Sequence, residues 1–301
     1  MLLIVGEAIV AYQRDLGSGG DAAQSFTGPW ASGAPAITAY IASRLGVGTQ
    51  FVGGVGADAG GEVMREAFER GGVRLDGLRV IPDRPTATAH ITYRGDAGRE
   101  FDFAVSDSAA TQVRETDLGT LPEQADWVHL SGSALVFGEP LAETALTAFD
   151  RARRAGARTS LDPNVRPEVL GEAARSALVE AIARADVLLP SEGEMAVLGV
   201  DVDRLVAAGA TVCTTYGPGG AEVRQGDVTT RLSAVETKVV DTDGAGDTFA
   251  AAFVAAALGG ASAVEAAGAG LRVAARAIAV DGPMTVELDP ALLSGNTPPR
   301  R

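Results

Sequence analysis

The stretch KVVDTDGAGDTFAAAFVAAAL, from Lys238 to Leu258, joins an apolar β-branched run to paired acids and glycines, then to an alanine-rich helix. Free N–H groups in the first turn of a helix carry partial positive charge, and glycine lets a phosphate approach them closely. Asp247 would stand inside this first turn, beside any anion bound there. A carboxylate so placed can accept a proton from an attacking hydroxyl while the amides hold the charge of a transferred phosphoryl group.

The same residues could instead form only a tight strand-to-helix turn, in which the acids favour the helix dipole. Spacing alone leaves the two interpretations equally open. The rest of the chain is needed to separate them.

Composition indicates an ordinary globular protein, since 46% of the 301 residues are hydrophobic and 21% are charged. The net charge is -14 and the pI about 4.6, which would repel nucleic acid because the sequence shows no concentrated basic patch. The single cysteine, Cys213, excludes an internal disulfide and argues against a cysteine metal site. The start MLLIVGEAIV lacks the features of a signal peptide, and no long uninterrupted apolar segment occurs. We therefore expect a cytoplasmic protein without a membrane partner.

Short apolar runs alternate with longer amphipathic stretches along the chain. This alternation predicts right-handed βαβ units and a mostly parallel sheet covered by helices. The expected strands cover residues 2–5, 50–52, 127–130, 159–161, 187–189 and 211–215, and the expected helices cover residues 35–45, 62–70, 140–154, 172–185 and 261–280.

Two regions, about 9–31 and 85–106, break this alternation. The second reads TATAHITYRGDAGREFDFAV between Thr86 and Val105, which predicts a hairpin turning at GDAG, residues 95–98. We expect the two regions to form one small β element over the carboxyl edge of the sheet, where open α/β folds bind ligands. Such a flap would exclude water from a reacting centre.

The segment VVDTDGAGDTFAAAF resembles the carboxy-terminal motif of the ribokinase-like, phosphofructokinase-B (PfkB) carbohydrate kinases, whose usual form DTTGAGD differs only at Asp243. The resemblance implies one ribokinase-like kinase domain over residues 1–301, a three-layer α/β/α sandwich with a mostly parallel central sheet and a small β-sheet lid. Other matches follow in the family's order: ASGAPAITAYIASRLGV, FVGGVGADAGGEVM, LDPNVRP, LLPSEGEMAVLG and TTYGPGGAEV.

By this resemblance, Asp247 is the catalytic base and also contacts the substrate, while the amides of Gly244, Ala245 and Gly246 form the anion hole. Glu194 stands at the acid of the family's Asn-x-x-Glu motif, which organises Mg²⁺ and phosphate through water. The nucleotide would also meet Thr215, Gly217, Gly220 and Gly268, and the substrate would meet Gly33, Ala34, Asn164 and Arg166.

The chain departs from the family pattern at four positions: Ser191 and Ile37 replace asparagines, Ala11 replaces an aspartate that binds sugar in many members, and Gly268 stands where an asparagine often lies near adenine. The losses at residues 11 and 37 remove polar contacts to sugar hydroxyls. Specificity for ribose or adenosine through the usual residues is therefore not expected.

The resemblance implies a kinase that transfers the γ-phosphate of MgATP to a ketohexose such as tagatose or fructose. Two alternatives remain open: a 2-keto-3-deoxygluconate kinase, and a non-catalytic sugar or nucleotide sensor on the same fold. An intact Asp247 with both glycines and Glu194 favours retained chemistry. The family also implies a monovalent cation such as K⁺ before Asp241 and a homodimer formed through the lid.

Two other nucleotide-binding motifs fit the chain poorly. GGVGADAGG has the G-x-G-x-x-A spacing of a dinucleotide fold at Gly54, Gly56 and Ala59, but it follows an earlier strand and helix. A Walker P-loop has no candidate lysine, because Lys238 precedes the glycines and follows no G-x-x-x-x-G.

Overall fold

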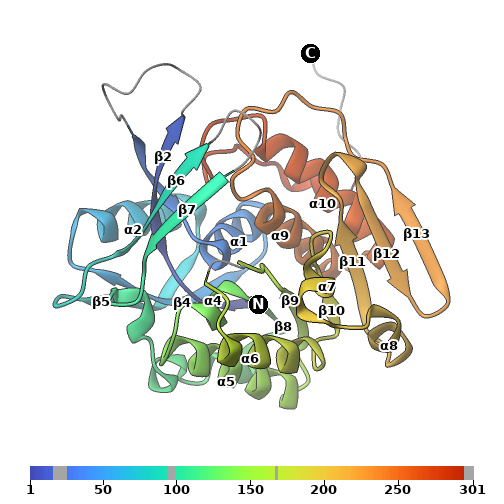
Figure 1. The fold of residues 1–301 in the computed structure, drawn as a ribbon, viewed down its shortest axis with the longest axis horizontal. Coiled ribbons are helices and arrows are strands. Elements are labelled where there is room, and N and C mark those ends of the chain that lie inside the picture. The colour runs from blue at the N-terminus through green and yellow to red at the C-terminus, as the bar shows by residue number, and fades with distance from the viewer. Residues whose placement is uncertain (16–25, 94–98, 167–168, 295–301) are drawn as a thin grey trace.

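A nine-stranded sheet forms the centre of the computed structural model, which describes residues 1–15, 26–93, 99–166 and 169–294 (Figure 1). Seven neighbouring strands of this sheet run parallel to one another, and an antiparallel hairpin closes one edge. Across the sheet the order is β13 (Val228–Leu232), β12 (Ala221–Gln225), β11 (Thr211–Thr215), β10 (Val187–Leu188), β9 (Arg158–Asp162), β8 (Trp127–Ser131), β1 (Leu2–Val5), β4 (Thr49–Gly56) and β5 (Arg74–Ile81).

Helices cover both faces of this sheet, so the fold is the expected three-layer α/β/α sandwich. Alternate side chains of β1 enter different cores: Leu2 and Ile4 pack on one face, Leu3 and Val5 on the other. One layer holds α1 (Ala34–Arg44), α2 (Ala59–Gly71), α9 (Ala245–Leu258) and α10 (Ala263–Ala277); the other holds α5 (Leu141–Arg154), α6 (Glu172–Ile182), α7 (Glu194–Leu198) and α8 (Val202–Ala207). Short helical turns are α3 (Leu121–Gln124), α4 (Ser133–Val136) and the 3₁₀ segments Ala109–Gln112, Glu115–Leu118, Gly217–Gly219 and Pro290–Leu293.

Strand β1 lies between β8 and β4, and this position locates the binding edge. After β1 the chain builds β4 and β5 on one side, whereas β8 and all later strands lie on the other. The connections that follow β1 and β8 therefore lead in opposite directions, which opens a crevice between the carboxyl ends of these two strands.

A second, four-stranded sheet stands at this edge, at the upper left of Figure 1. Its order is β3 (Thr27–Ser32), β2 (Ile9–Asp15), β6 (Ala87–Tyr93) and β7 (Arg99–Ala104). The parallel pairing of β2 with β6 joins the two segments that interrupt the strand–helix alternation. The small β-sheet is thus confirmed, while the GDAG turn at residues 95–98 lies outside the described residues.

The six expected strands of the main sheet all form, and the five expected helices agree within a few residues at each end. The prediction missed β5 and the β12–β13 hairpin. These strands lie toward the sheet's two edges. Many side chains of β5 and β13 are exposed, and buried residues of β12 alternate with partly exposed ones, so none of the three has a continuous apolar run.

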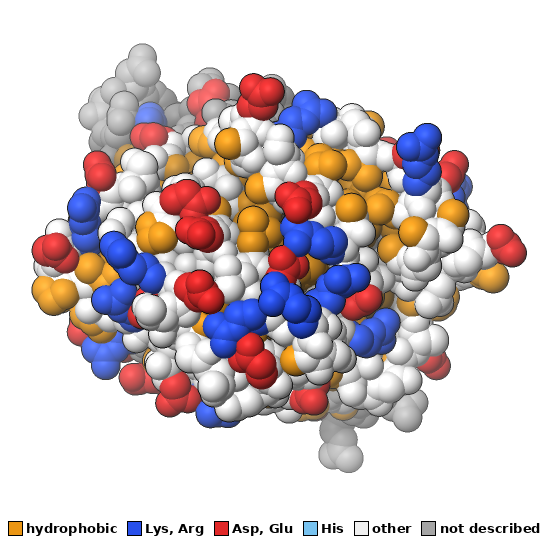
Figure 2. Space-filling view, turned by 90° about the horizontal axis from the view of Figure 1, so that it is seen from below, with side chains coloured by type: hydrophobic (Ala, Val, Ile, Leu, Met, Phe, Trp, Pro, Cys, Tyr) orange, Lys and Arg blue, Asp and Glu red, His pale blue; other side chains and the backbone are white. Residues whose placement is uncertain are grey.

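On the face shown in Figure 2, basic side chains gather near the middle and acidic side chains lie among them. Opposite charges also pair directly among the described residues, for example Arg184 with Asp150 and Arg151 with Glu123, each at 2.7 Å. Within the described part of the chain, no helix has the length and hydrophobicity needed to cross a bilayer.

Candidate active site

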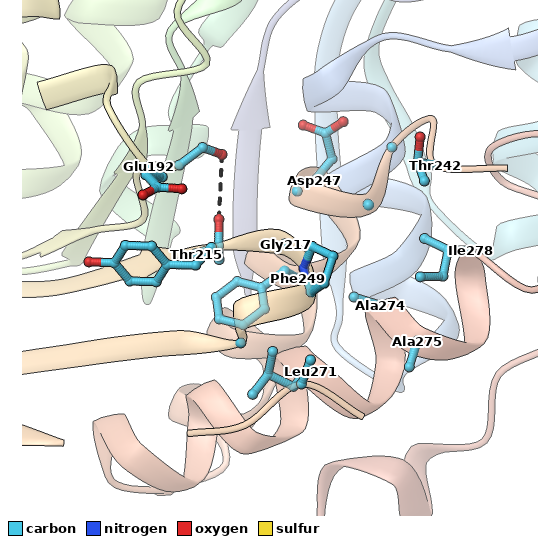
Figure 3. A pocket seen from close by; sticks show the side chains of 18 of the residues that line it. Glu192, Thr215, Gly217, Thr242, Asp247, Phe249, Leu271, Ala274, Ala275 and Ile278 are labelled. Atoms are coloured by element: carbon cyan, nitrogen blue, oxygen red, sulfur yellow. Dashed lines mark hydrogen bonds between the residues drawn. The ribbon is translucent and has the colours of Figure 1, made fainter. Parts of the chain in front are cut away.

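A pocket of about 910 Å³ lies at the carboxyl edge of the main sheet, within the usual size range of small-molecule sites. Residues that follow β9, β10 and β11 form one side, and α9 and α10 form the other. Figure 3 shows the Asp247 carboxylate at one end of the pocket and the small apolar side chains of α10 at the other.

Helix α9 begins at this pocket without a side-chain cap. Gly244 precedes the helix with a φ of 72°, and a Cβ there would lie 3.0 Å from Cδ1 of Ile37. A Cβ on Gly246 would meet no atom within 4 Å, so this residue faces open space. The first turn therefore presents backbone to the pocket, as an anion-binding helix start requires.

Asp247 lies in that first turn and is 8% exposed. Its Oδ1 accepts a hydrogen bond of 3.3 Å from Nδ2 of Asn164. Burial raises the pKa of Asp247 to about 7; Arg166 opposes the rise, and the charges of Asp243 and Glu194 add to it. A carboxylate with this pKa is suited to accept a proton near neutral pH.

The loop after β9 brings Asn164 and Arg166 to this carboxylate. Asn164 adopts a φ of 42°, and its backbone N–H donates to Oδ1 of Asp162 at 2.9 Å. Arg166 acts electrostatically on both aspartates, and its guanidinium carbon lies 5.1 Å from the ring centroid of Phe101 on β7. Arg166 thus links the pocket to the small sheet.

Glu194, at the start of α7, joins two strand-end loops. Its Oε1 accepts from the N–H of Val165 and its Oε2 from the N–H of Ser191, both at 2.7 Å. Burial raises the pKa of Glu194, while these two backbone bonds and Arg166 lower it. Because the contact to residue 191 uses the backbone, it does not depend on the missing asparagine side chain.

Asp162 is a pocket residue that the sequence reasoning missed. Its pKa is raised well above the usual value, first by burial and then by the charges of Glu194 and Asp247. The signal was present, because an acid ending a buried parallel strand in LDPNVRP points to the ligand-binding edge.

The other end of the pocket is largely apolar. Thr215, Gly217 and Gly220 line it as expected, and Thr215 shares a hydrogen bond of 3.4 Å with Ser191. Its apolar wall consists of Val235, Val239, Leu271, Ala274, Ala275 and Ile278. Such a wall would suit a flat aromatic ring. Sequence patterns gave no signal for most of these residues.

Three predicted residues are not among those lining this pocket. Gly33, with a φ of 104°, precedes α1, and a Cβ there would lie 2.9 Å from the carbonyl oxygen of Glu7. The carbonyl of Ala34 accepts from Thr38 Oγ1, which also lies 3.4 Å from the Asp247 carbonyl. A Cβ on Gly268 would lie 3.3 Å from Nη1 of Arg272, and residues one turn later on α10 form the wall instead.

Comparison with known proteins decides the family. The family model described as "pfkB family carbohydrate kinase" matches residues 1–289. This chain belongs to that family. It is therefore a carbohydrate kinase, a phosphotransferase.

Similar proteins include several fructokinases. The fructokinase of Salmonella typhimurium is 32% identical over 236 residues, covering 74% of this chain and 75% of that protein. A fructokinase from Vibrio cholerae, solved with fructose, ADP and a calcium ion, is 27% identical with a TM-score of 0.81, covering 98% and 97% of the two chains. A potassium-bound form of its double mutant is also known. Fructokinase from Xylella fastidiosa with bound ATP is 25% identical with a TM-score of 0.85, covering 98% and 97%.

The left-handed backbone of Asn164 in this PfkB kinase gives a stability prediction. A left-handed conformation costs most L-residues roughly 1–2 kcal/mol but costs glycine almost nothing. We expect Asn164→Ala to unfold at lower urea concentration than Asn164→Gly, although both lose the bond to Asp247. Equal midpoints for the two variants would show that the backbone at this position relaxes.

Proposed function

We propose that this protein is an ATP-dependent ketohexose kinase that phosphorylates a hydroxyl of a fructose-like or tagatose-like sugar. The observation that carries the proposal is the buried Asp247 carboxylate, with a pKa near 7, in the first turn of an uncapped helix. The fructokinases among its relatives favour a ketohexose.

In the proposed reaction, the Asp247 carboxylate accepts the proton of a sugar hydroxyl as that oxygen attacks the γ-phosphorus of ATP. The bond between the γ-phosphorus and the β,γ-bridging oxygen breaks, and ADP leaves with its electron pair. The amides of Gly244, Ala245 and Gly246 would stabilise charge on the transferred group. Arg166 would pair with phosphate oxygens through its planar guanidinium. The adenine would lie against the apolar wall at the other end of the pocket, and the small sheet would act as the lid.

The residues present fit a Mg²⁺ ion held through water. The charge of Glu194 adds to the raised pKa of both Asp162 and Asp247, and a bound cation would relieve this repulsion. Glu194 uses one lone pair of each oxygen for a backbone amide and keeps others for water. Bound Mg²⁺ would neutralise charge on the phosphates, while Glu194 would orient its water ligands.

A monovalent cation such as K⁺ near Asp241, homodimerisation through the lid and a cytoplasmic location also belong to this proposal. The Asp241 carboxylate already accepts from the N–H groups of Asp243 and Gly282, and from Gln13 of the small sheet. It therefore connects the lid to the loop that precedes α9.

The substrate assignment can be tested by ADP release with MgATP and a panel of fructose, tagatose, 2-keto-3-deoxygluconate, ribose and adenosine. We expect turnover on a ketohexose. Asp247→Asn should lower kcat by about 10² to 10⁴, whereas the exposed control Asp76→Asn should not. Turnover on 2-keto-3-deoxygluconate alone would replace the ketohexose assignment, and near-normal activity of Asp247→Asn would refute its role as base.

The pKa of Asp247 predicts the acid side of the pH profile. Only the ionised carboxylate can accept the proton. We therefore expect kcat/KM to rise with pH and to reach half of its plateau value at about pH 7. Steady-state rates between pH 5 and 9 on the active sugar would measure this. A rise centred near pH 4 would mean that burial does not control this group.

Glu194 gives a separate prediction about the metal. Removing a residue that orients a metal's ligands typically costs about 10- to 100-fold in metal affinity. Glu194→Gln should raise the Mg²⁺ concentration for half-maximal activity in that range. Glu192→Gln, which changes another pocket acid in the same loop, is the matched control. An equal effect of both variants would point to general charge rather than a metal role.

A further inference from the structure

Glu7 is a buried acid that the proposed reaction does not use. It follows β1 at the point where the sheet's connections diverge, and it is only 1% exposed. Its Oε1 accepts a hydrogen bond of 2.6 Å from Oγ of Ser133, while its Oε2 has no hydrogen-bond partner among the described residues. Acids buried to this degree are rare unless a cation pairs with them, so the burial of Glu7 is unusual and points to a specific role.

A chain of contacts connects Glu7 to the loop beside the base. Ser133 begins α4, and its Oγ also lies 2.9 Å from Oγ of Ser131. Between them, the N–H of Gly132 donates to the carbonyl of Asp162 at 2.8 Å. A Cβ on Gly132 would lie 1.9 Å from the carbonyl oxygen of Pro163, so the backbone of this turn packs closely against the loop after β9.

That loop carries Asn164, whose amide donates to the Asp247 carboxylate. Glu7 therefore holds the α4 turn, the α4 turn supports the loop, and the loop orients the base. No contact in this series needs a charge on Glu7, because a neutral carboxylic acid also accepts the Ser133 bond through its carbonyl oxygen.

Burial raises the pKa of Glu7 to about 8. The hydrogen bond from Ser133 and the charge of Arg166 lower this pKa, whereas the charge of Asp247 raises it further. Asp247 and Arg166 are the described charged groups that act on it. An ionised Glu7 would repel the Asp247 carboxylate and compete with it for Arg166.

We propose that Glu7 positions the Asn164–Asp247 pair through the α4 turn, and that a negative charge on Glu7 disturbs this pair by repelling the Asp247 carboxylate, which slows phosphoryl transfer. This rests on the proposed function of Asp247. Glu7 is a positioning residue, since it touches neither the base nor the described pocket.

The kinetic test uses Glu7→Gln, which keeps an oxygen for Ser133 but cannot ionise. Wild-type kcat should decline with a midpoint of about pH 8 as Glu7 loses its proton. The Gln variant should match wild type at pH 7 and lack this decline, with KM for ATP unchanged. An alkaline decline at the same midpoint in both proteins would overturn the proposal.

Ser133→Ala provides a second kinetic test. Because the Ser133 bond lowers the pKa of Glu7, its removal should move the alkaline midpoint to higher pH. Ser131→Ala, which removes the neighbouring hydroxyl without touching Glu7, should leave the midpoint close to wild type. Should Glu7→Gln fail to fold, an unmoved midpoint in Ser133→Ala would itself overturn the proposal.

A measurement without substrate separates failure of this inference from failure of the kinase assignment. Folded wild type should bind the Glu7 proton more tightly than the unfolded chain between pH 4.5 and about 8. Its folding equilibrium constant should therefore fall about tenfold per pH unit relative to that of Glu7→Gln across this range. Urea titrations of both proteins from pH 5 to 9 measure the ratio, and a constant ratio would rule out a neutral Glu7.

Discussion

The burial of carboxyl groups at the carboxyl edge of the sheet is the constraint on which this site depends. Burial raises the pKa of Asp162, Glu194 and Asp247, the charge of Glu194 adds to the rise for both aspartates, and Arg166 lowers the pKa of all three. Burial is the largest cause of each shift. The site thus holds an acid, Asp247, whose pKa of about 7 lies near neutral pH, and such shifts are common at functional sites.

The architecture explains why these acids meet. Parallel strands end at the same edge, so Asp162 after β9 and Glu194 after β10 face the start of α9 across one crevice. Backbone amides of Val165 and Ser191 hold Glu194 from two loops. Arg166 reaches from the same edge to Phe101 of the small sheet, so one side chain contacts both the pocket and that sheet.

Much of the fold could be predicted because its signals are local. The strands at 2–5 and 211–215 were predicted with their observed bounds, since buried parallel strands read as short apolar runs. The edge hairpin β12–β13 was not predicted, because exposed strands lack such runs. Among the pocket residues, Asp247 and Gly244 were predicted from spacing and motif. Leu271 and Ala275 of α10 were not predicted, because such residues are common on any buried helix face.

The sequence by itself determined the strand–helix alternation, the glycine-rich start of α9 and the place of Asp247 in its first turn, because each depends on residues adjacent along the chain. Only the tertiary structure decided that Asp162 lines the pocket, that the backbone N–H of Ser191 donates to Glu194, and that Glu7 is buried. Burial and charge coupling depend on distances between residues such as Glu7 and Asp247, which lie on separate elements far apart in sequence. No local pattern records those distances.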